Sequence, residues 1–144
     1  MTVEIVKKAE DRQEIPMLTS VFFIGLAIIL IMVSKVPVAI AMYQNGGYNN
    51  RYPRQQQSNL TGWGCRALAA HQNTLEGFPV FAAAIISGVI LQVPEPLLML
   101  VGGVYCLSRL LYIGFYLLNW HLLRSTVWGI GLVACLFPFF YPFI

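Results

Sequence analysis

Charged residues are scarce in this sequence. Asp, Glu, Lys and Arg make up 10% of its 144 residues, whereas hydrophobic residues make up 58%. Soluble globular domains usually contain about 25% charged residues, so the composition excludes an ordinary soluble domain. We therefore predict that the lipid bilayer is the main solvent of this chain, with membrane lipids as its immediate partners.

Several functional classes are excluded by what else is missing. The nine Lys and Arg residues are spread along the chain and give a net charge of only +3, so we expect no nucleic-acid binding. The cysteines at 65, 106 and 135 are widely spaced and odd in number, which predicts reduced, buried thiols rather than a disulfide framework. The sequence has no paired histidines and no acidic cluster, so we expect no metal site. Residues 1–16 are polar and mixed in charge, which does not match a cleaved signal peptide.

Four long apolar segments run through the rest of the chain. We expect helices over about 17–43, from Ser58 or Thr61 to about 93, from 94 to about 119, and from Arg124 to the aromatic C-terminus. The predicted fold class is all-α, an integral membrane four-helix bundle formed by one domain, residues 17–144, after a polar tail, residues 1–16. The first loop is long and polar, and the second is very short.

The positions of basic residues indicate how the bundle crosses the membrane. Arg51 and Arg54 lie in the first loop and Arg124 lies at the third, so these two loops are predicted to be cytoplasmic. Lys7, Lys8 and Arg12, in the tail on the other side, argue against this orientation. With four spans, both termini lie on the same side of the membrane.

Polar side chains inside the spans form two stripes. On the second helix Arg66 and Asn73 nearly eclipse, and Glu76 lies within about 80° of Arg66. On the third helix the stripe consists of Arg109, Tyr112 and Tyr116, at i, i+3 and i+7. Because buried charges in a membrane are costly and usually mark function, these stripes predict a pocket for a polar, anionic ligand.

The first and fourth helices add to this charged layer. Lys35 lies in the first span, and Arg124 and Ser125 lie where we expect the fourth helix to begin. The four spans leave little internal volume for so many charges, so we expect several copies to pack around one axis as a homotrimer.

Each polar residue also has a purely structural interpretation. Glu76 and Arg109 are expected to lie within contact distance, as an ion pair that joins the second and third helices. Tyr112 and Tyr116 fit an aromatic belt, and Arg124 fits a topology anchor. His71 points about 140° away from Arg66, which favours a residue of the headgroup region or a hydrogen bond between helices over a catalytic base.

Four sequence runs together resemble one known family. They are Arg66–Glu76 followed by Pro79 and Phe81, Val33–Ile40, Arg109–Tyr116, and Arg124 with Ser125. They resemble the MAPEG family, the membrane-associated proteins in eicosanoid and glutathione metabolism, over nearly the whole chain from Met17 onward. The resemblance implies a trimer of four-helix bundles that binds glutathione at subunit interfaces near the cytosolic face. It also implies conjugation, peroxide reduction or isomerisation of lipophilic small-molecule substrates.

The resemblance assigns roles to the polar residues described above. Arg124 and Ser125 would be catalytic, because a guanidinium, a hydroxyl and a helix start together favour a thiolate. The residues that would bind glutathione are Lys35, Arg66, Asn73, Glu76, Arg109, Tyr112 and Tyr116.

The sequence departs from the glutathione-using members at several positions. Gly47, Ala69 and Gln72 stand where those members carry Arg, and Tyr112 stands where His is common. Fewer guanidinium groups predict weaker binding of the two carboxylates of glutathione. Two hypotheses stay open: a glutathione-dependent transferase or peroxidase, and a non-catalytic relative that binds a lipid headgroup or serves as an assembly partner.

Overall fold

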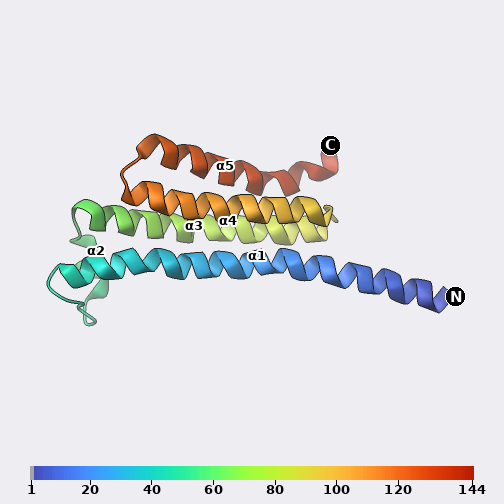
Figure 1. The fold of residues 1–144 in the computed structure, drawn as a ribbon, viewed down its shortest axis with the longest axis horizontal. Helices are drawn as coiled ribbons and strands as arrows, with labels where there is room; N and C mark the ends of the chain where they lie inside the picture. The colour runs from blue at the N-terminus through green and yellow to red at the C-terminus, as the bar shows by residue number, and fades with distance from the viewer. Residues whose placement is uncertain (1) are drawn as a thin grey trace.

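The computed structural model describes the backbone of residues 2–144 and the side chains of residues 20–144. Its long helices are α1 (Thr2–Gln44), α3 (Gly62–Ile90), α4 (Glu95–Leu117) and α5 (His121–Phe140). The short elements are α2 (Pro53–Ser58) and the 3-10 helix η1 (Tyr141–Phe143). The long helices run alternately up and down, with α3 and α4 between α1 and α5, and both termini lie at one end (Figure 1). The prediction of an all-α four-helix bundle is confirmed.

Each long helix, the last one together with η1, provides a segment that is long and apolar enough to cross a membrane. These segments are Ser20–Gln44, Gly62–Ile90, Glu95–Leu117 and His121–Phe143. The expected polar tail, residues 1–16, is continuous with α1 from Thr2 onward, and its side chains lie outside the described part of the chain. The chain therefore has four membrane-spanning helices, as the sequence predicted.

Two tight turns fix where the helices end. After α3, Gln92 has a φ of 55° and the amide of Val93 donates to the carbonyl of Gly88, at 2.9 Å. After α4, Asn119 has a φ of 61° and the amide of Trp120 donates to the carbonyl of Phe115, at 2.9 Å. Both turns have the hydrogen bonds of a Schellman motif, which closes a helix through one residue in the left-handed conformation.

The second of these turns corrects the predicted start of the fourth helix. Because the chain reverses at Asn119, α5 begins at His121, three residues before the expected Arg124. The amide of Arg124 already donates to the carbonyl of Trp120, at 3.0 Å, so it is not one of the free amides of the helix start. The first loop also differs from the prediction, because it contains α2.

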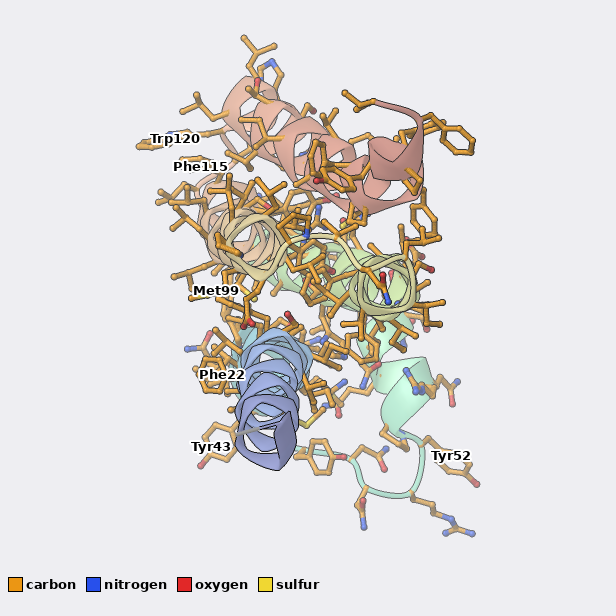
Figure 2. All side chains as sticks on the ribbon, turned by 90° about the vertical axis from the view of Figure 1, so that its right-hand side faces the viewer. Phe22, Tyr43, Tyr52, Met99, Phe115 and Trp120 are labelled. Atoms are coloured by element: carbon orange, nitrogen blue, oxygen red, sulfur yellow. The ribbon has the colours of Figure 1, made fainter. Side chains whose placement is uncertain are left out.

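The core lies where α1, α3, α4 and α5 meet. Phe81 of α3 is fully buried, and its ring stacks on Tyr105 of α4 with centroids 4.0 Å apart. Ala27, Ile85 and Cys106 belong to the same buried cluster. The side chains between the helices and on their outer faces are shown end-on in Figure 2. The cysteines are free; Cys106 and Cys135 are buried as predicted, but Cys65 is exposed, contrary to the prediction.

Candidate functional site

Arg109 is the most enclosed charged side chain among residues 20–144. It is 2% exposed, and its Nη1 donates to Oδ1 of Asn73 on α3, at 2.9 Å. Its guanidinium carbon lies 5.2 Å from the ring centroids of both Tyr105 and Tyr112, within the range of cation–π attraction. Within the described residues, its buried Nε has no hydrogen-bond partner. This buried donor is therefore unsatisfied within the described part of the single chain.

Two glycines let the neighbouring helices approach Arg109 closely. A Cβ at Gly77 of α3 would lie 3.1 Å from the hydroxyl of Tyr105 and 3.4 Å from Nη1 of Arg109. A Cβ at Gly131 of α5 would overlap the hydroxyl of Ser108 and lie 3.3 Å from Nη2 of Arg109. Larger residues at these two positions would push α3 and α5 away from the guanidinium.

A cavity of about 160 Å³ opens beside Arg109, between α3, α4 and α5. Its lining consists of Asn73, Glu76, Gly77, Val80, Tyr105, Arg109, Trp128, Leu132 and Cys135. Pockets that enclose a ligand of drug size usually measure about 300–1,000 Å³. The cavity of a single chain therefore accommodates only part of a ligand as large as a tripeptide.

The predicted ion pair between Glu76 and Arg109 is wrong. Its side chain is exposed although it lies near the middle of α3, and in the described structure it forms no ion pair with Arg109. Arg109 donates to Asn73 instead, so the two helices are joined by an amide rather than by a carboxylate. Glu76 and Arg109 still face the same cavity.

The stripe predicted on the third helix forms a continuous row in the structure. Tyr112 lies between Arg109 and Tyr116, and its ring centroid is 5.4 Å from that of Tyr116. The guanidinium carbon of Arg124, on α5, lies 4.2 Å from the ring centroid of Tyr116. Arg66 also reaches α4, where its Nη2 lies 3.4 Å from the carbonyl oxygen of Leu117. The structure therefore brings together polar residues of α3, α4 and α5 on one side of the bundle.

Ser125 and Lys35 lie outside this row. The hydroxyl of Ser125 is exposed and donates to the carbonyl of His121 in its own helix, at 3.0 Å. Lys35 is on α1, directly after Ser34, and does not line the cavity beside Arg109. His71 is buried and hydrogen-bonded to the hydroxyl of Ser34, at 2.8 Å, which confirms the predicted bond between helices.

The sequence analysis missed part of the cavity wall. Tyr105 stands one helical turn before Arg109, and its ring centroid lies 5.2 Å from the guanidinium carbon, so the i, i+4 spacing of the two residues was the available signal. Trp128 lies one turn after Arg124 and also lines the cavity. Among the described residues, no three His, Cys, Asp or Glu side chains are placed to hold a metal ion.

The model of the MAPEG family matches residues 19–144. The chain belongs to the MAPEG family. The match covers all four membrane-spanning helices and every residue of the site, and this family is generally associated with glutathione. No curated protein and no solved structure matches the chain.

Proposed function

We propose that this MAPEG protein is a membrane enzyme that transfers glutathione to lipophilic electrophiles, or uses it to reduce lipid peroxides. One observation carries the proposal: the row of polar groups from Asn73 through Arg109 and Tyr112 to Tyr116 and Arg124. Polar groups inside a membrane are costly and are therefore usually functional. The row runs from the buried Arg109 to the half-buried Arg124 near the third loop.

The donors along the row fit the chemistry of glutathione. Glutathione has two carboxylates, and Arg109, which lines the cavity, is a suitable cationic donor for one of them. Glutathione also has an ammonium group, and Glu76 is an exposed carboxylate on the cavity wall. Arg66, at the end of α4, is a second cation for the other carboxylate.

Arg124 and Tyr116 are suited to the reactive step. A thiol reacts as its thiolate, and a cation beside the sulfur stabilises that form. The Arg124 guanidinium supplies the charge. Tyr116, whose ring packs against that guanidinium, supplies a hydroxyl as hydrogen-bond donor. Ser125 would join as a donor only by releasing the carbonyl of His121. The lipophilic substrate would enter from the bilayer.

We propose a homotrimer for two physical reasons. Glu76 is exposed inside a membrane-spanning helix, and an ionised carboxylate facing lipid costs several kcal/mol. In addition, the cavity of about 160 Å³ is too small to enclose glutathione. A second copy packed against α3 would cover Glu76 and complete the cavity. Native mass spectrometry in mild detergent should show trimers; monomers or dimers alone, at several protein concentrations, would refute this assembly.

The test of the activity is calorimetric titration of glutathione into the detergent-solubilised protein, followed by a rate measurement. We expect saturable binding, and glutathione-dependent turnover of a generic hydrophobic electrophile or a lipid hydroperoxide. Binding without turnover of either substrate would refute the proposed enzymatic activity. Absence of binding would favour the alternative, a non-catalytic MAPEG protein that binds a lipid headgroup or serves as an assembly partner.

A further inference from the structure

The loop between α1 and α3 surrounds a polar hollow, at the end of the bundle away from both termini (Figure 1). The hollow has a volume of about 310 Å³, near the lower end of the range for small-molecule pockets. Its lining consists of five Asn and Gln residues, two glycines and Tyr52. All of these residues lie in the described part of the chain, and none of them carries a formal charge.

Two of the lining side chains hold the loop in this shape. Gln56 ties α2 to the end of α1, because its Nε2 donates to the carbonyls of Met42 and Gly47, at 3.1 and 2.6 Å. Its Oε1 accepts from the amide of Asn49, at 2.9 Å. Oδ1 of Asn49 in turn accepts from two backbone amides further along the loop, at 3.0 and 3.1 Å. The hollow is therefore formed by the loop itself and does not require a ligand.

The other amide side chains of the lining are available to a ligand. Asn45, Gln55 and Asn59 are exposed, and within residues 20–144 none of their side chains takes part in a hydrogen bond. A side-chain amide has both donors and an acceptor, and so has each hydroxyl group of a polyol. An ionic ligand would instead require a lining of opposite charge. The lining therefore matches an uncharged group that is rich in hydroxyls.

The loop lies where a lipid headgroup can reach it. The first membrane-spanning segment ends at Gln44, directly before the hollow, and Tyr43 and Tyr48 are exposed there, as is typical of residues at a membrane surface. At the edge of the hollow, the guanidinium carbon of Arg51 lies 5.5 Å from the ring centroid of Tyr52. A cation at this edge can contact the phosphate that links a headgroup to its lipid.

We propose that the polar hollow binds the polyol or sugar headgroup of a membrane lipid. The amides of Asn45, Gln55 and Asn59 contact the hydroxyls of the headgroup, and Arg51 lies beside its phosphate. The site is separate from the proposed glutathione site and does not depend on it.

Native mass spectrometry of the full chain tests this proposal. The protein would be released from mixed micelles that contain equal amounts of phosphatidylinositol and phosphatidylserine, and the retained lipids counted. These two lipids have the same net charge, so a preference reports on the hydroxyls. The wild type should retain phosphatidylinositol preferentially. Gln55→Ala and Asn59→Ala should each lower this preference by roughly fivefold, the effect expected from the loss of one hydrogen-bonding amide.

The matched control is Asn50→Ala, which removes an exposed amide from the same loop but not from the lining of the hollow. Its preference should equal that of the wild type, and an equal loss in this control would overturn the proposal. Wild-type protein without a preference would overturn it as well. Free myo-inositol that displaces the lipid at equal concentration would overturn the assignment to a lipid, since the occupant would then be a soluble polyol. Unchanged helical circular dichroism of Gln55→Ala and Asn59→Ala would exclude misfolding.

Discussion

Arg109 and Arg124 have the same side chain on neighbouring helices but opposite surroundings. Arg109 is 2% exposed, lies between two tyrosine rings and donates to Asn73. Arg124 is half-buried and packs on the single ring of Tyr116. The comparison shows that several fixed partners tie Arg109 to the fold although it also lines the cavity, whereas Arg124 keeps a free side.

The comparison predicts different consequences when each cation is removed. Loss of Arg109 should act mainly on stability, because its partners have no other donor. Loss of Arg124 should act mainly on chemistry. Glu76 lines the same cavity as Arg109, and Ser125 follows Arg124 in the chain. Substitutions at these two residues test whether the distinction between stability and chemistry also holds for their neighbours.

The largest effect on stability is expected for Arg109→Ala. The change leaves the buried oxygen of Asn73 without its donor and opens a space beside Tyr105 and Tyr112. We expect a loss of about 4 kcal/mol in the free energy of unfolding, measured by thermal or denaturant unfolding in detergent. Arg66→Ala is the control, since its only described hydrogen bond is long, at 3.4 Å. Equal losses in both variants would contradict the distinction between fixed and free cations.

Arg124→Ala should produce the largest effect on chemistry. Without the guanidinium the thiolate of bound glutathione loses its charged partner, so turnover of a hydrophobic electrophile should fall about a hundredfold. Binding should change less, because Arg109 and Arg66 still contact the carboxylates. Arg124→Lys should recover part of the rate, since it restores the charge without the planar group. A wild-type rate with an unchanged pH profile in Arg124→Ala would refute its role and make Tyr116 the next candidate.

Glu76→Gln should have an intermediate effect. Because Glu76 is exposed and forms no ion pair with Arg109 in the described structure, the variant should fold normally. It should bind glutathione about tenfold more weakly, since it removes the partner of the ammonium group. The control is Gln72→Ala, one turn earlier and also exposed. Severe destabilisation by Glu76→Gln would instead indicate that the carboxylate has a buried cationic partner, as the sequence had suggested.

Ser125→Ala is expected to have the smallest effect. Its hydroxyl donates to the carbonyl of His121 on an exposed face of α5, and such a bond contributes little. Turnover should therefore stay within about fivefold of the wild type. A hundredfold loss in steady-state rate would show that the hydroxyl leaves His121 and contacts the sulfur.

These expectations indicate what the sequence alone could and could not determine. Hydropathy and the prolines at 94 and 96 predicted the spans, because a membrane requires long apolar helices. The row of Arg109, Tyr112 and Tyr116 was predictable because helical periodicity is fixed by backbone geometry. Both conclusions depend on local properties of the chain.

Features that depend on packing between helices were predicted poorly. The rotation of α3 against α4 determines whether Asn73 or Glu76 meets Arg109, and it depends on close contacts such as that at Gly77. The start of α5 depends on the left-handed turn at Asn119. The predicted start was too late because Arg124 and Ser125 resemble the first residues of a helix. Trp128 and Cys135 belong to the cavity wall only because α5 packs against α3.

The central claim is that Arg124 and Tyr116 hold the sulfur of glutathione as a thiolate. Ultraviolet difference spectroscopy of glutathione added to the purified protein at neutral pH measures this directly, because a thiolate absorbs where a thiol does not. The wild type should show the thiolate band and Arg124→Ala should lack it, with both proteins saturated according to calorimetry. Saturated wild-type protein without the band, or a band of equal height in Arg124→Ala, would contradict the account.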